Sequence, residues 1–207
     1  MTTEKMALSR RDQILRAVAL MLETRPGERV TTAGLAREVG VSEAALYRHF
    51  SCKSTIYEQL IAFVEESLLS RINKIIRDKH SPVVTCEHIL TLLLIFCEKN
   101  PGLTRILTGD ALQGELYPLS ARVEQLFKRI ETHLRQVLRN GHIKAESRPT
   151  RLDHSAAANL MLALVEGRIQ QFVRSQFKQR PSHNWSEQWQ AVASSLFLAR
   201  QNGPPES

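Results

Sequence analysis

Apolar residues recur along most of the chain at intervals of three and four, the spacing that places them on one face of an α-helix. No segment alternates with the two-residue period of a β-strand, and no internal repeat is present. The pattern predicts helices over about 9–23, two short helices within 31–50, and further helices over about 54–77, 81–100, 102–108, 118–140, 153–177 and 186–200. The expected fold is therefore all-α with nine helices. Three form an N-terminal head, six form a body, and the long fourth helix joins the two.

Residues 31–50 have the spacing of a helix-turn-helix. Five apolar side chains fall at intervals that let two short crossing helices share one core: Leu35, Val39, Val41, Leu46 and Phe50. Ala36 is small where the two helices must approach closely, and Gly40 falls at the turn, where a positive φ favours glycine. An ordinary pair of short helices is the alternative interpretation.

Hydroxyl side chains stand at both expected helix starts of this segment. Thr31 or Thr32 is placed to cap the first helix, and Ser42 is placed to cap the second. Capping of this kind leaves backbone N–H groups pointing outward, and the partial positive charge of a helix N-terminus suits phosphate. Short residues at the start of the second helix, over 42–45, suit entry into the major groove of DNA.

The charge of the chain favours a polyanionic partner. Its 207 residues include 28 Lys and Arg against 21 Asp and Glu, which leaves a formal net charge of +7. The excess is not confined to the head, because basic residues also gather at 122–151 and 168–180. Surface solvation is the simpler explanation of those two clusters.

Signals of other protein classes are missing from the sequence. The three cysteines have no metal-ligand spacing, and reduced thiols in a cytoplasm are expected. The N-terminus lacks the apolar core of a signal peptide, and the longest apolar stretch, 92–97, is too short to span a bilayer. With no glycine-rich phosphate loop, no nucleophile elbow and no histidine pair beside a carboxylate, we expect no enzyme, no metal and no cofactor.

The residues after the second short helix strengthen the DNA-binding interpretation. Tyr47-Arg48-His49-Phe50, followed by Lys53 and then Ile56-Tyr57, resembles the segment that closes the DNA-binding domain of TetR-family transcriptional regulators. The resemblance implies that Tyr47, His49 and Lys53 hold backbone phosphates. With the helix starts included, the candidate DNA-contacting residues are Thr31, Thr32, Ser42, Glu43, Ala44, Tyr47, His49 and Lys53.

Base-edge recognition is expected to be modest. By the resemblance, base edges would face Ser42, Glu43, Ala44 and Tyr47, none of which is the Arg, Asn or Gln on which direct readout usually relies. Much of the affinity is then expected from phosphate contacts and DNA shape.

The last two helices are apolar on more than one face, which exceeds what one monomer core requires. Two copies of this helix pair can form a four-helix dimer interface, and a dimer can present two heads to the half-sites of a palindrome. The predicted interface residues are Leu160, Leu164, Phe172, Trp189 and Leu196. The alternative is that both helices are simply buried within one monomer.

Segments of both the head and the body resemble a narrower group within the TetR family, the nucleoid occlusion factors. The resemblance covers about residues 10 to 198, and the matching segments are 41–50, 65–73, 100–112 and 173–181. It implies a dimer that binds chromosomal sites in the cytoplasm, on the nucleoid, and antagonises assembly of the tubulin-like division GTPase FtsZ. In this group the acidic C-terminal tail of FtsZ lies in a groove between the fourth and fifth helices.

Residues that fit such a peptide are present at the expected groove. Phe63 and Leu92 offer apolar contact, Arg71 and Lys99 offer positive charge, and Asn100 can bond the peptide backbone. Phe63 and Leu92 also lie in apolar stripes, so burial in the core is the alternative for both.

The chain departs from the group at three positions. Ile95 stands where glycine is expected and would narrow or reshape the groove. Lys99 replaces an arginine and loses its bidentate reach to carboxylates, and Cys52 replaces the usual proline before Lys53.

These expectations divide the chain into three parts: a helix-turn-helix domain over 1–53, a helical dimerisation and partner domain over 54–201, and a disordered tail over 202–207. Two rival functions remain. One is a ligand-responsive TetR-family repressor, which needs a large apolar cavity in the body. The other is an architectural DNA binder without a protein partner.

Overall fold

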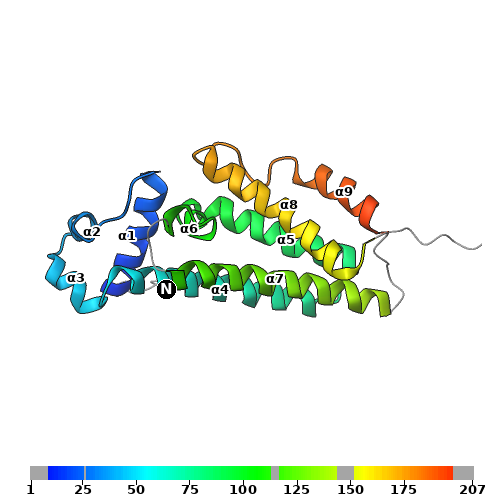
Figure 1. The fold of residues 1–207 in the computed structure, drawn as a ribbon, viewed down its shortest axis with the longest axis horizontal. Coiled ribbons are helices and arrows are strands. Elements are labelled where there is room, and N and C mark those ends of the chain that lie inside the picture. Colours follow the sequence, from blue (N-terminus) through cyan, green and yellow to red (C-terminus); the bar gives the residue numbers. More distant parts are fainter. Residues whose placement is uncertain (1–8, 26, 113–116, 144–151, 198–207) are drawn as a thin grey trace, which may run out of the picture. The chain divides into compact units, whose positions relative to one another are not determined.

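The structure is a computed structural model that describes residues 9–25, 27–112, 117–143 and 152–197. Within these residues the chain forms nine α-helices and one short 3-10 helix, η1, which confirms the all-α, nine-helix expectation (Figure 1). The elements are α1 (Arg10–Thr24), α2 (Thr32–Val39), α3 (Glu43–His49), α4 (Lys53–Arg77), α5 (Pro82–Lys99), α6 (Pro101–Leu107), η1 (Asp110–Leu112), α7 (Tyr117–Ile143), α8 (His154–Arg174) and α9 (Trp185–Leu196). None of the helices in these ranges combines the length and the apolar character that a bilayer crossing requires.

The chain divides into two compact units, each described by itself. The first comprises residues 1–66 and 100–124, so it contains α1 to α3, the first part of α4, α6, η1 and the start of α7. The second comprises residues 67–99 and 125–207, with the remaining turns of α4, α5, most of α7, α8 and α9.

The core of the first unit is built from one face of each short helix. Ile14, Val18 and Leu22 are the buried face of α1, which packs against α2 and against α6. Leu35 and Leu46 are the buried centres of α2 and α3, as their spacing predicts. This packing fixes the crossing of α2 and α3, the two helices expected to meet DNA.

The turn between α2 and α3 depends on a glycine. Gly40 has a φ of +70° and a ψ of 42°, the left-handed conformation that costs a residue with a Cβ energy. Its N–H bonds to the carbonyls of Ala36 and Arg37 and so closes α2, while the N–H of Val41 also reaches Ala36. The sequence-based expectation of a positive φ at this position is confirmed.

The second unit is organised around α5. This helix has nine buried residues over Pro82–Lys99 and packs against α8 and α9. Trp185 at the start of α9 is buried and donates a hydrogen bond from Nε1 to the hydroxyl of Thr91 on α5 (2.8 Å). Its ring lies 5.8 Å from that of Trp189, so aromatic packing joins the first two turns of α9 to the core.

Three helix ends differ from the expectation. Asn140-Gly141 was expected to end the seventh helix, but α7 continues through Gly141 to Ile143. A Cβ placed on Gly141 would lie 2.1 Å from Cγ of Pro82, so this glycine permits close approach of the start of α5 rather than a turn. Helix α8 ends at Arg174 rather than near 177, because Gln176 and Phe177 both have positive φ. Helix α9 ends at Leu196 rather than near 200, because Phe197 has an extended backbone (φ −114°, ψ 114°). The expected tail over 202–207 lies outside the described residues.

Candidate nucleic-acid interface

The two helix starts of the helix-turn-helix are capped as the sequence predicts. The hydroxyl of Thr31 accepts a hydrogen bond from the N–H of Gly34 (3.1 Å), so Thr31 rather than Thr32 is the cap of α2. The hydroxyl of Ser42 accepts one from the N–H of Ala45 (3.2 Å) at the start of α3. In both helices the remaining N–H groups of the first turn keep the partial positive charge of the N-terminus available to phosphate.

Thr32 has a different role from capping. Its hydroxyl donates a hydrogen bond to the carboxylate of Glu43 (3.0 Å) and so links the first turn of α2 to the first turn of α3. Both side chains were predicted to contact DNA. Two candidate DNA-contacting residues are therefore hydrogen-bonded to each other.

The outer face of α3 is accessible. Glu43, Ala44, Tyr47 and His49 are exposed, and the tyrosine side chain remains 48% exposed despite its size. An exposed tyrosine carries a hydroxyl that can donate to a phosphate and a ring that can contact a sugar or base. The exposed face therefore contains the predicted contacts while Leu46, on the opposite face, holds the helix to the core.

Lys53 begins α4 and is half-buried. Its ammonium group lies 5.5 Å from the centre of the buried Tyr57 ring, which orients the stem of the lysine along an aromatic surface. The neighbouring Cys52 is exposed, and hydrogen bonding with Thr55 lowers the pKa of its thiol. The unusual residue before Lys53 thus leaves the start of α4 intact.

Two arginines that hold this unit together were missed by the sequence analysis. The guanidinium of Arg11 on α1 lies 4.8 Å from the centre of the Phe50 ring, and its Nε donates to Gln59 on α4 (2.8 Å). Arg105 on α6 is only 3% exposed, and its Nη1 donates to the carbonyls of Leu22 (3.0 Å) and Arg25 (3.2 Å) at the end of α1. Helical periodicity gives no signal for either, because it identifies apolar positions and not the partners of a charged side chain.

The environment of Arg105 satisfies its charge. Nε donates to the carboxylate of Asp110 in η1, and the two carbonyls accept from the other side of the guanidinium. Cations are favoured at helix C-termini by the helix dipole, and α1 ends at Thr24. This one side chain therefore fixes the end of α1 and the α6–η1 segment to each other.

A second ion pair joins α4 to α7 within the first unit. Arg122 donates from Nε and Nη2 to the two oxygens of Glu65 (3.1 and 2.6 Å) and from Nη1 to the carbonyl of Glu58 (3.2 Å). The bidentate hydrogen bond with Glu65 raises the pKa of Arg122. It also holds the central part of α4 against the start of α7.

The five residues predicted to contact an acidic peptide are distributed over both units. In the first, Phe63 on α4 is 54% exposed, so core burial is wrong for that residue. Asn100 there is half-buried at the N-cap of α6, and its carbonyl accepts from the hydroxyl of Thr104 (2.9 Å). In the second, Arg71 and Lys99 are exposed, whereas Leu92 is half-buried on α5.

The predicted dimer residues fall into two classes. Leu160 is 48% exposed and Leu164 is half-buried, so α8 presents an apolar surface in a single chain. Phe172, Trp189 and Leu196 are instead at most 4% exposed. The last three are buried within one chain, which favours a role in supporting α8 and α9 rather than in facing a partner.

Among the described residues, no group of three or more His, Cys, Asp or Glu side chains is arranged to hold a metal ion. Cys86 and Cys97 are buried, and burial raises the pKa of the Cys86 thiol to about 12. A thiol with so high a pKa is a packing group rather than a nucleophile.

Comparisons with known families match both parts of the chain. Residues 14–60 match the family described as bacterial regulatory proteins, tetR family. Residues 79–197 match the SlmA-like family described as tetracyclin repressor-like, C-terminal domain.

Similarity to individual relatives extends over nearly the whole chain. It is 54% identical over 190 residues to the nucleoid occlusion factor SlmA of Shewanella woodyi, covering 92% of this chain and 96% of that protein. It is 52% identical over 193 residues to the nucleoid occlusion factor SlmA of Shewanella amazonensis, covering 93% and 98% respectively.

Solved structures share the fold at much lower identity. The TetR-family regulator PfmR of Thermus thermophilus is 20% identical, with a TM-score of 0.73, covering 94% of this chain and all of that one. A ketosteroid transcriptional regulator of Mycobacterium tuberculosis is 18% identical, with a TM-score of 0.74, covering 93% of this chain and 97% of that one. At such identity these two structures support the fold alone.

Proposed function

This chain belongs to the SlmA nucleoid occlusion factors within the TetR family of DNA-binding regulators, and on that premise we propose that it blocks septation over DNA through FtsZ. As a dimer on palindromic chromosomal sites in the cytoplasm, it antagonises FtsZ assembly. The observation that carries the proposal is the similarity to nucleoid occlusion factors along both units, rather than along the head alone. TetR-family proteins are regulators, so we assign no catalytic step to it.

DNA binding is assigned to residues 1–53. The capped starts of α2 and α3 would receive phosphates, together with Tyr47, His49 and Lys53, while Ser42, Glu43 and Ala44 would face base edges. Residues 54–201 would supply dimerisation and partner binding. Within them, Leu160 and Leu164 would lie in the dimer seam.

The partner is an acidic peptide, the C-terminal tail of FtsZ. The exposed guanidinium of Arg71 and ammonium of Lys99 would pair with its carboxylates, Phe63 and Leu92 would give apolar contact, and Asn100 would bond its backbone. An exposed phenylalanine on a helix otherwise held by buried aliphatic residues supports this assignment, because such a side chain is stabilised by a partner. The ammonium group of Lys99 cannot form the paired hydrogen bonds to a carboxylate that an arginine forms, so we expect a moderate affinity for the FtsZ tail.

The decisive experiment separates the two activities by reversing one charge. Arg71→Glu should abolish FtsZ antagonism and leave operator affinity nearly unchanged. Residue 71 lies roughly 27 Å along α4 from Lys53, at about 1.5 Å per residue, which is several screening lengths at physiological salt. Operator titration measures the first activity, and FtsZ co-sedimentation with division phenotype measures the second.

Arg77→Glu is the matched control. It is also exposed on α4, but it lies about 120° away from Arg71 around the helix axis, so it should leave both activities intact. Loss of both activities in Arg71→Glu would indicate misfolding or a shared site. Loss of neither would show that Arg71 does not hold the FtsZ tail.

A further inference from the structure

A hollow of about 570 Å³ lies in the second unit, where α8 ends and α9 begins. Three cationic side chains line it, Arg168, Lys178 and Arg180, together with His183 and four Asn or Gln side chains. No carboxylate is among these lining residues. The volume falls in the range of small-molecule sites, and the lining is polar throughout, which does not suit the apolar ligand of the rival repressor function.

The segment that forms one wall of this hollow has an unusual backbone. Gln176, Phe177 and Asn184 have φ values of 52°, 66° and 55°, the left-handed region that residues with a Cβ rarely adopt. Gln176 and Phe177 form the C-terminal turn of α8, where the N–H of Phe177 donates to the carbonyl of Phe172 (2.9 Å). Asn184 is the N-cap of α9. These helix ends give the connection between α8 and α9 a defined course along the hollow.

Arg168 holds the segment in this shape. Its Nε donates to the carbonyl of Pro181 (2.6 Å), and its other nitrogens donate to the His183 carbonyl and to the side chain of Gln188 on α9. The guanidinium also lies 5.8 Å from the centre of the buried Trp185 ring. These hydrogen bonds hold the guanidinium of Arg168 in place, so it contributes a fixed positive charge to the lining of the hollow.

Lys178 and Arg180 differ from Arg168 because both are exposed. The side chain of Arg180 is 74% exposed and lies 3.9 Å from the carboxylate of Glu98, a long contact for an ion pair. Glu98 also accepts a hydrogen bond from Ser182. Because exposed ion pairs of this length are weak, an anion in the hollow can recruit Arg180 at little cost.

We propose that this hollow binds a small soluble polyphosphate of the class of nucleoside di- and triphosphates. Phosphate oxygens would receive charge-assisted hydrogen bonds from Lys178 and Arg180 over the fixed charge of Arg168. The surrounding amides offer both donors and acceptors, which suits the sugar and base of a nucleotide. The proposal goes beyond DNA and FtsZ binding, and its failure would leave both untouched.

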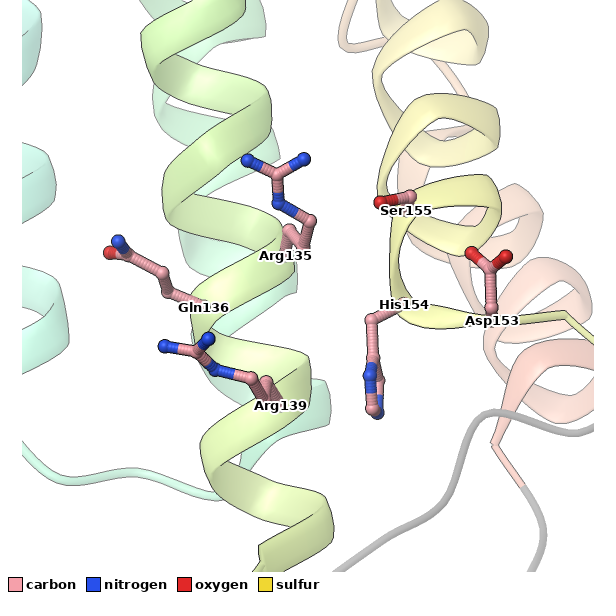
Figure 2. Close-up of a pocket in the computed structure, with 6 residues that line it drawn as sticks. All are labelled: Arg135, Gln136, Arg139, Asp153, His154 and Ser155. Carbon is pink, nitrogen blue, oxygen red and sulfur yellow. The ribbon is translucent and has the colours of Figure 1, made fainter.

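A second basic hollow provides a matched comparison. It has about 270 Å³, and Figure 2 shows Arg135 and Arg139 on α7 beside Asp153, His154 and Ser155 at the start of α8. Here a carboxylate is part of the lining: Asp153 accepts a hydrogen bond from the N–H of Ala156 (2.8 Å) and so caps α8. Its negative charge makes this hollow less suited to a polyphosphate.

The test is calorimetric titration of the intact dimer at low salt with ATP, ADP, pyrophosphate and adenosine. ATP and ADP should bind, pyrophosphate should bind more weakly, and adenosine should give no heat. Lys178→Gln and Arg180→Gln should each weaken ATP binding roughly tenfold, because each removes one charge-assisted contact. The control Arg139→Gln removes an equal charge at the second hollow and should leave ATP binding unchanged.

Several outcomes would overturn the proposal. Leu160, Leu164 and Arg168 lie on one face of α8, the face proposed to meet the partner subunit. If the partner covers the hollow, no polyphosphate will bind, which would overturn the proposal. An equal loss of affinity in Arg139→Gln would show general charge attraction rather than a site. Thermal melts of each variant verify folding, so that absent binding by a folded dimer counts against the site.

Discussion

The hydroxyl of Thr32 donates a hydrogen bond to the carboxylate of Glu43 across 3.0 Å, which joins the first turns of α2 and α3. Both helix starts are the expected phosphate sites, so a negative charge stands where negative ligands would bind. We therefore expect Glu43 to oppose DNA binding electrostatically while its hydrogen bond to Thr32 links the two helices.

Glu43→Gln tests this balance. Glutamine keeps an oxygen that can accept from Thr32 but removes the charge, so affinity for operator and random DNA should rise together, by roughly threefold to tenfold at low salt. Fluorescence anisotropy with both DNAs measures the change. Asp78→Asn, an exposed carboxylate after α4 in the second unit, is the control and should have no effect. A fall in affinity for both DNAs would contradict this prediction and would mean that the hydrogen bond of the Glu43 carboxylate to Thr32 matters more than its charge.

Lys53→Ala should weaken binding to specific and random DNA alike. The change removes one proposed phosphate contact, so the slope of log affinity against log salt should become shallower by about one unit. Lys74→Ala, on α4 in the second unit, removes the same charge and should leave the slope unchanged. Altered sequence preference with an unaltered slope would contradict the phosphate assignment.

Leu160→Glu should dissociate the dimer without unfolding the chain. Leu160 is 48% exposed in a single chain, so a carboxylate is tolerated there until a partner must bury it. Sedimentation would show monomers with an unchanged helical circular dichroism spectrum.

Leu196→Glu, by contrast, should lower stability by about 3 kcal/mol or more, because residue 196 is 4% exposed within one chain. If Leu160→Glu instead remains a stable dimer, the dimer interface does not include Leu160.

Arg105→Leu should destabilise the protein by about 2 kcal/mol, measured by urea denaturation. The substitution leaves the carbonyls of Leu22 and Arg25 without their shared donor in a buried environment. Arg25→Leu is the comparison: its side chain makes an exposed ion pair with Glu38 (2.9 Å), and its loss should cost less than about 1 kcal/mol. Equal costs for the two variants would mean that Arg105 does not anchor α1.

Sequence periodicity was sufficient for the order and type of the helices, because each one buries a single apolar face that repeats every three to four residues. The caps at Thr31 and Ser42 and the left-handed Gly40 were also predictable, since short-range hydrogen bonding and steric limits act within a few residues. The end of α7 was not predictable in this way. Gly141 resembles a turn locally, and only the approach of Pro82, distant in sequence, shows why glycine stands there.

The sequence by itself determined the all-α fold and the helix-turn-helix, because these follow from local spacing. Tertiary structure decided which apolar side chains are available to partners. Phe63 and Leu160 remain exposed. Three others are buried in the core of one chain: Phe172, Trp189 and Leu196. It also decided the role of Arg105, whose three acceptors come from α1 and η1. The physical reason is the same in each case. Burial and hydrogen-bond partnership depend on segments far apart in the chain, and periodicity records only which face of a helix is apolar, not what covers it.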